Sequence, residues 1–221
     1  MKALADLFDG KILKYTILPL LMSLVFWGLV FYVFSDEIYD FIMTYLSYVP
    51  FGESFKNVIA TIGSGIIIAI FYYLLVISTL GVFTSLFIDH IVLRINEKHY
   101  GCKPKKPTMK DLIEGIKVSV VSFLIYLIIF MFTFFLLFVP VVNIIYQLFM
   151  WAILNKKPLV FDSSYLFMDP KAVEKELGAK IWVIVILTSF IYFVPILSLF
   201  GYTFQLIFVT HTVLNYCKGK K

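Results

Sequence analysis

Four long runs without a formal charge constrain this chain most: residues 15–35, 58–88, 118–155 and 181–217. The first run has 21 residues, enough to cross a hydrocarbon core of about 30 Å as a helix. The others have 31, 38 and 37 residues, so the longer ones would be about 55 Å long as straight helices. Only 15% of the residues are charged, and a soluble fold would expose large apolar patches. The sequence therefore predicts an all-α integral membrane protein.

The last two runs share a weak internal repeat that contains a proline. Phe138-Val139-Pro140 and Phe193-Val194-Pro195 each stand inside a run that is too long for one crossing. Proline fixes φ and lacks the amide donor, which favours a bend or turn. We therefore predict a helical hairpin over each run, with its tip at the proline. A single kinked helix is the alternative, and the repeat does not decide whether the hairpins cross the membrane fully or enter and return.

The predicted domain organisation is one membrane domain over residues 1–221. An amphipathic segment over residues 1–14 precedes the first transmembrane helix at 15–35 and the second at 58–88. Hairpin 1 covers 118–155 and hairpin 2 covers 181–217.

The charges between the runs predict the orientation in the membrane. Residues 36–57 carry four acidic side chains against one lysine, whereas residues 89–117 carry seven basic and four acidic side chains. Because loops rich in Lys and Arg stay in the cytoplasm, the first segment is predicted outside and the second inside. Lysines also follow both proline-containing runs, so an even number of crossings places both termini in the cytoplasm.

No residue pattern indicates chemistry inside the membrane. The four runs contain no Asp, Glu, Lys or Arg, so we predict no catalytic residue and no enzyme. Cys102 and Cys217 form no CxxC motif, and the three histidines are dispersed, so we expect no metal ligands, no cofactor and no disulfide between cytoplasmic thiols. The net charge of +5 is explained by topology, so nucleic acid is not an expected partner.

Polar side chains after the two prolines are the candidates for a solute path. Asn143 and Gln147 lie one helical turn apart after Pro140, and a second set follows Pro195: Ser198, Thr203 and Gln205. These amides and hydroxyls either line a common path or form hydrogen bonds between helices. An anion could also be attracted by helix N-termini and by lysines at the mouth, without a buried formal charge.

Several segments together resemble the CysZ-type sulfate permeases and the related etoposide-induced membrane protein family. The opening Ile17-Leu18-Pro19-Leu20-Leu21 is similar to the first helix of that family, and Leu86-Phe87-Ile88-Asp89 to the segment that leaves its second helix. The order of the two Phe-Val-Pro segments, with Phe161-Asp162 between them, resembles its hairpins and their connector.

The resemblance implies two long transmembrane helices, two pairs of partially penetrating helices, a homo-oligomer in membrane lipid and sulfate as substrate. It also implies a location in the bacterial inner membrane. The sulfate-associated Gly-Leu-Arg-Arg stretch of the family corresponds here to residues 10–15, where Lys14 falls at one arginine position and Leu13 at the other. A lysine supplies the charge but not the bidentate fork of a guanidinium group.

We therefore expect a permease or channel for a small oxyanion, sulfate first, that serves sulfur assimilation. Lys11 and Lys14 are expected to attract the anion on the cytoplasmic side, and Asn143 and Gln147 to line its path. A non-transporting membrane scaffold or assembly protein of the same family is the alternative hypothesis.

Overall fold

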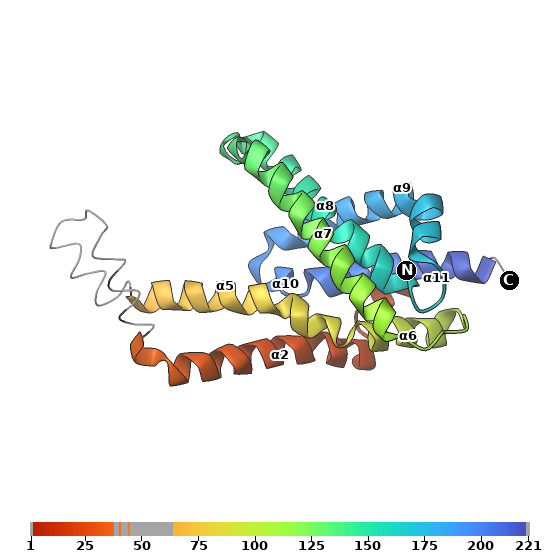
Figure 1. Ribbon diagram of the computed structural model, residues 1–221, viewed down its shortest axis with the longest axis horizontal. Helices are drawn as coiled ribbons and strands as arrows, with labels where there is room; N and C mark the ends of the chain where they lie inside the picture. The colour runs from red at the N-terminus through yellow and green to blue at the C-terminus, as the bar shows by residue number, and fades with distance from the viewer. Residues whose placement is uncertain (1, 38–39, 41–43, 45–63, 220–221) are drawn as a thin grey trace. The chain divides into compact units, whose positions relative to one another are not determined.

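The computed structural model describes residues 2–37, 40, 44 and 64–219, and every regular element in this part of the chain is a helix (Figure 1). The predicted all-α membrane fold is confirmed. Residues 58–63 of the predicted second span lie outside the described residues. The elements are α1 (Lys2–Asp6), α2 (Gly10–Val33), α5 (Ser64–Ser85), α6 (Ile88–His99), α7 (Met109–Thr133), η2 (Phe134–Phe138), α8 (Pro140–Ser164), α9 (Pro170–Thr188), η3 (Ser189–Phe193), α10 (Pro195–Ser198) and α11 (Gly201–Gly219).

Three of these helical segments are long and apolar enough to cross a membrane: Gly10–Val33, Met109–Phe138 and Pro170–Phe193. Residues 79–85 and 88–99 pass the same test only when they are taken together as one broken span. These helices agree with an integral membrane protein.

The chain forms two compact units, one of Ile17–Leu86 and one of Met1–Thr16 with Phe87–Lys221. In the first unit, α2 and α5 are joined by hydroxyl groups. Ser23 donates to the carbonyl oxygen of Val76 at 2.9 Å, and the Trp27 indole donates to the Thr79 hydroxyl at 2.9 Å. Short polar side chains that bond across helices are a common means of association in lipid, where apolar burial gives no driving force.

The two prolines of the repeat occupy the same structural position. Pro140 is the first residue of α8 and Pro195 the first of α10, and a short 3₁₀ helix, η2 or η3, precedes each. Proline suits this position because the first amide of a helix has no intrahelical acceptor. Val139 and Val194 adopt extended backbones with nearly equal dihedrals, φ −100° and ψ 107° against φ −102° and ψ 109°. The predicted break at each proline is confirmed.

The helices on either side of each break pack against one another. α7 runs beside α8 (Figure 1), and the hydroxyls of Thr133 and Tyr146 lie 2.9 Å apart across the break. α9 packs against α11, where the Gln205 amide reaches the carbonyl oxygen of Val185 at 3.1 Å. Both runs are therefore helical hairpins, and neither is a single kinked helix.

The hairpin helices extend well beyond the charge-free runs. α7 begins at Met109, where Thr108 and Asp111 form a reciprocal capping box, and α9 begins at Pro170, where the Asp169 side chain accepts from the Lys171 amide. α8 continues through two lysines to Ser164. Charge counting marks only the apolar part of a helix, whereas the backbone hydrogen bonds continue until a cap ends them.

The core of the larger unit lies between α6, α8, α9 and α11. Its fully buried side chains include Ile91, Ile95, Leu159, Leu206 and Leu214. By contrast, large apolar side chains along α7 stay exposed in the chain, among them Leu124, Ile128, Met131 and Phe132. An exposed apolar surface of this kind is suited to lipid or to a second copy of the chain.

Candidate functional site

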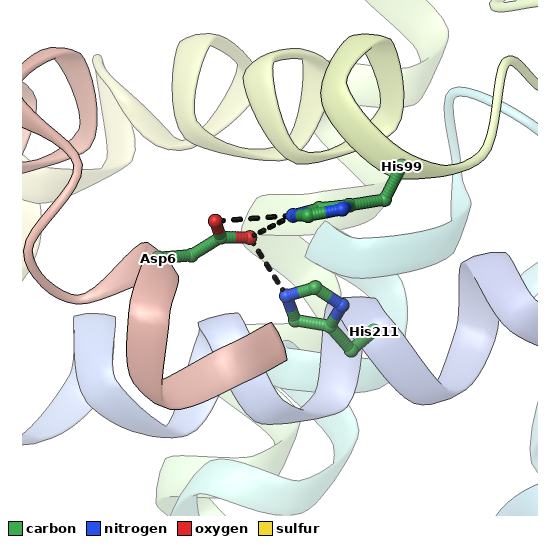
Figure 2. A group of neighbouring side chains, drawn as sticks. All are labelled: Asp6, His99 and His211. Carbon is green, nitrogen blue, oxygen red and sulfur yellow. Dashed lines mark hydrogen bonds and ion pairs between the residues drawn. The ribbon is translucent and has the colours of Figure 1, made fainter. Parts of the chain in front are cut away.

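A buried carboxylate joins three segments that are far apart in the sequence. Asp6 ends α1, His99 ends α6, and His211 lies in the second half of α11 (Figure 2). The Asp6 side chain is fully buried, and its Oδ2 lies 2.9 Å from Nε2 of each histidine. The two imidazole rings thus converge on one carboxylate oxygen.

Lys98 supplies the positive charge beside this carboxylate. Its Nζ lies 2.7 Å from Oδ1 of Asp6 and 3.0 Å from Oδ2 of Asp9, and Asp9 also pairs with Arg94 at 3.5 Å. Burial raises the pKa of Asp6, but hydrogen bonds from Lys98 and His99 outweigh it and hold that pKa below its usual value. The hydrogen bond from Lys98 is likewise the main cause that lowers the pKa of Asp9 to about 2. Both carboxylates are therefore ionised at neutral pH.

A second polar network lies inside the helical core. The fully buried Gln205 accepts from Asn155 at 2.9 Å and from the Tyr192 hydroxyl at 3.2 Å. Its amide nitrogen donates to Val185 and to the Ser189 hydroxyl. These bonds connect α8, α9, η3 and α11. The sequence analysis left two roles open for Gln205, lining a solute path or forming hydrogen bonds between helices. In the structure Gln205 forms hydrogen bonds between helices.

Two tyrosine hydroxyls bind carboxylates between α8 and its neighbours. Tyr165 donates to Asp89 at 2.5 Å, and Tyr202 donates to Asp162 at 2.5 Å. Of the Phe161-Asp162 pair that marked the connector between the hairpins, Asp162 thus contacts α11, whereas Phe161 packs in a cluster with Tyr165 and Leu166. These bonds hold the ends of α6, α8 and α11 together.

The expectation that the two cysteines stay unpaired is wrong. Cys102 and Cys217 form a disulfide, with Cα atoms 6.6 Å apart across 115 residues of sequence. A left-handed turn at Gly101, with φ 66°, directs the chain after α6 back toward α11. The Asn96 side chain then holds Cys102 by two backbone hydrogen bonds of 2.8 Å. The sequence argument used the redox state of the compartment and could not anticipate this contact.

The family model described as Sulfate transporter CysZ/Etoposide-induced protein 2.4 matches residues 1–211. The chain belongs to this family. No curated protein matches the chain, and no solved structure does. The family match and the apolar helices together establish a membrane protein of a transporter family.

The sulfate transporter family match covers all four residues predicted to form a solute site. Lys11 and Lys14 lie one turn apart near the start of α2, and both are exposed. Asn143 and Gln147 lie on consecutive turns of α8, where the Gln147 amide donates to Asn143 at 2.5 Å. The structure brings each pair together. No hydrogen bond or ion pair joins one pair to the other within the residues that the structure describes.

The cluster of Asp6, His99 and His211, called the Asp6 cluster below, was missed by the sequence analysis. His99 and His211 follow Asp6 by 93 and 205 positions in the sequence. One signal was available in the sequence. The N-terminal segment, the segment after the second span and the C-terminal segment were all predicted on the cytoplasmic side, so their polar residues could have been expected to meet.

Proposed function

We propose that this member of the CysZ/etoposide-induced family is a permease or channel for a small oxyanion. Sulfate is the first candidate, taken up for sulfur assimilation. The family match over residues 1–211 carries this proposal, and helices long enough to cross a membrane support it.

Lys11 and Lys14 attract the anion at the cytoplasmic mouth. Both side chains are exposed, and neither makes a hydrogen bond or ion pair with Asp6 or Asp9 among the described residues. Helix N-termini commonly attract anions, but here the Asp9 carboxylate already accepts from the amides of Lys11 and Ile12. The lysine side chains, and not the backbone amides of α2, therefore supply the attraction.

Asn143 and Gln147 line the path at the start of α8. The first turn of a helix presents backbone N–H groups that no intrahelical carbonyl accepts, and α8 begins at Pro140, three residues before Asn143. The Asn143–Gln147 bond uses one amide hydrogen of Gln147, which leaves donors for an anion. Both side chains are only partly buried, so a second copy completes the path and the protein acts as a homo-oligomer within the lipid.

Both termini face the cytoplasm of a bacterial inner membrane in this proposal, and the Cys102–Cys217 disulfide is then an exception to the reduced state of most cytoplasmic thiols. The cluster of Asp6, His99 and His211 supports a common side for the N-terminal segment, the segment after the second span and the C-terminal segment, since their side chains are in contact. The lysine excess of residues 89–117 assigns that side to the cytoplasm.

This topology predicts that exposed positions in three segments react from the same side. Single cysteines at Lys106, Lys171 and Lys218, all exposed, are placed in a chain with Cys102→Ser and Cys217→Ser. A membrane-impermeant maleimide is expected to label all three in inverted vesicles and none in intact spheroplasts. Labelling of Lys171→Cys from the outside alone would contradict an even number of crossings in hairpin 1.

Uptake of radiolabelled sulfate into proteoliposomes tests the proposed function directly. Saturable uptake that selenate inhibits is the expected result. The alternative, a non-transporting scaffold, predicts no uptake and a protein partner that co-purifies with the chain.

A further inference from the structure

Three metal-ligating groups converge at one point outside the proposed anion path. The donor atoms of Asp6, His99 and His211 all lie within 4.8 Å of one another, and Figure 2 shows both rings directed at the same carboxylate. The Asp6 side chain is fully buried, and the side chains of His99 and His211 are only 15% and 10% exposed. The group is thus largely shielded from water.

Two of these groups, His211 and Asp6, have outer partners of the kind that metal sites use. A ligating histidine usually makes a hydrogen bond through its other ring nitrogen, and a ligating carboxylate is itself hydrogen-bonded. Here Nδ1 of His211 lies 2.8 Å from the Tyr100 hydroxyl. Lys98 holds Oδ1 of Asp6 at 2.7 Å, while Oδ2 lies 2.9 Å from both rings. Nε2 of His99 also lies 3.1 Å from Oδ1, so His99 contacts both carboxylate oxygens, whereas His211 contacts Oδ2 and Lys98 contacts Oδ1.

We propose that Asp6, His99 and His211 bind one Zn²⁺ ion, which cross-links α1, α6 and α11. Two imidazole nitrogens and one carboxylate oxygen are a ligand set that Zn²⁺ accepts in tetrahedral geometry, with bonds of about 2.0–2.2 Å. Tetrahedral ligands at that bond length are about 3.3 Å apart. The 2.9 Å distances from Oδ2 to each ring need to open by a few tenths of an ångström, and the two Nε2 atoms, which lie within 4.8 Å of each other, need to take up the same spacing. Water takes the fourth position.

The protons of the cluster are compatible with this ion. In the metal-bound form both Nε2 atoms give their lone pairs to zinc, so each neutral ring carries its proton on Nδ1. For His211 that proton is donated to the Tyr100 oxygen, at the 2.8 Å already present. Asp6 binds as a carboxylate, with Lys98 still on its other oxygen.

The test uses the full-length chain, free of an affinity tag, purified in detergent and stripped with a chelator. Equilibrium dialysis against ZnCl₂, followed by elemental analysis, is expected to give one zinc per chain and a higher Tm, because the ion binds only the folded state. His99→Asn and His211→Asn are each expected to lose the ion. His90→Asn is the matched control, since His90 is an exposed histidine of the same helix α6 and lies outside the cluster.

The ligands of the bound ion provide a measurement that does not depend on the variants. X-ray absorption of the zinc-loaded wild-type chain is expected to show two imidazole ligands and oxygen. Sulfur ligands would overturn the proposal, because they would place zinc at the cysteines. Failure of the folded wild-type chain to bind zinc would also overturn it, as would equal binding by folded His99→Asn and His211→Asn. The sulfate uptake assay is independent of all these outcomes.

Discussion

Replacing Asp6 with alanine is expected to lower the Tm of the purified protein by about 6–12 °C, one of the two largest effects that we predict. The carboxylate is fully buried and accepts from Lys98, His99 and His211. Removal of one partner from a buried ion pair costs about 3–5 kcal/mol. We use the lower cost, about 3 kcal/mol, because the Lys98 side chain is about one third exposed and still forms its ion pair with Asp9 in the variant. In a chain of about 220 residues, each kcal/mol changes Tm by roughly 2–4 °C.

Thermal unfolding of the chelator-treated protein in detergent, followed by tryptophan fluorescence, measures this effect without any bound metal. Glu97→Ala is the matched control, because Glu97 is an exposed acid on the same helix as Lys98. Its Tm is expected to stay close to that of the wild type, since a surface substitution of this kind usually changes stability by less than about 0.5 kcal/mol. Equal Tm values for the two variants would show that the Asp6 cluster does not hold the three segments together.

Reversal of both charges at Lys11 and Lys14 to glutamate is expected to reduce sulfate uptake roughly tenfold or more. A local field of one sign raises the encounter rate of an oppositely charged solute by about 10–10³-fold, and the double variant replaces attraction with repulsion. The wild-type rate is expected to fall more steeply with ionic strength than the variant rate, because salt screens exposed charges. Initial rates of uptake at a fixed sulfate concentration measure both effects.

The control for this variant carries the same change of charge on another helix. Lys175→Glu with Lys180→Glu alters two exposed lysines of α9 and is expected to keep most of the uptake. If the control loses as much uptake as the double variant of α2, the effect belongs to net charge and not to Lys11 and Lys14. Unchanged uptake in a well-folded double variant of α2 would remove these residues from the anion path.

Local features of the sequence predicted much of the fold. Pro140 and Pro195 break their helices where the repeat indicated, because a missing amide and a fixed φ act on the chain wherever the tertiary structure places it. The start of α7 at Met109 was not predicted, although the capping pair of Thr108 and Asp111 stood in the sequence. Counting uncharged residues measures the apolar length and ignores caps.

The specific partners in contacts over long distances in the sequence could not be predicted. The disulfide between Cys102 and Cys217 depends on a turn at Gly101 and on the path of α11, which no pattern near either cysteine encodes. Gln205 was identified as a polar residue within an apolar run, but only the packing of α8, α9 and α11 shows that its amide is fully used between helices. The residue type therefore showed that Gln205 needs hydrogen-bond partners, and only the tertiary structure shows which residues these partners are.

The most direct test of the proposed function is uptake of radiolabelled sulfate into proteoliposomes that contain the purified full-length chain. Empty vesicles serve as the blank, and selenate, phosphate and chloride serve as competitors. We expect saturable uptake that selenate inhibits strongly and chloride inhibits little. Absence of uptake in vesicles shown to hold folded protein would contradict an oxyanion permease with sulfate as its substrate.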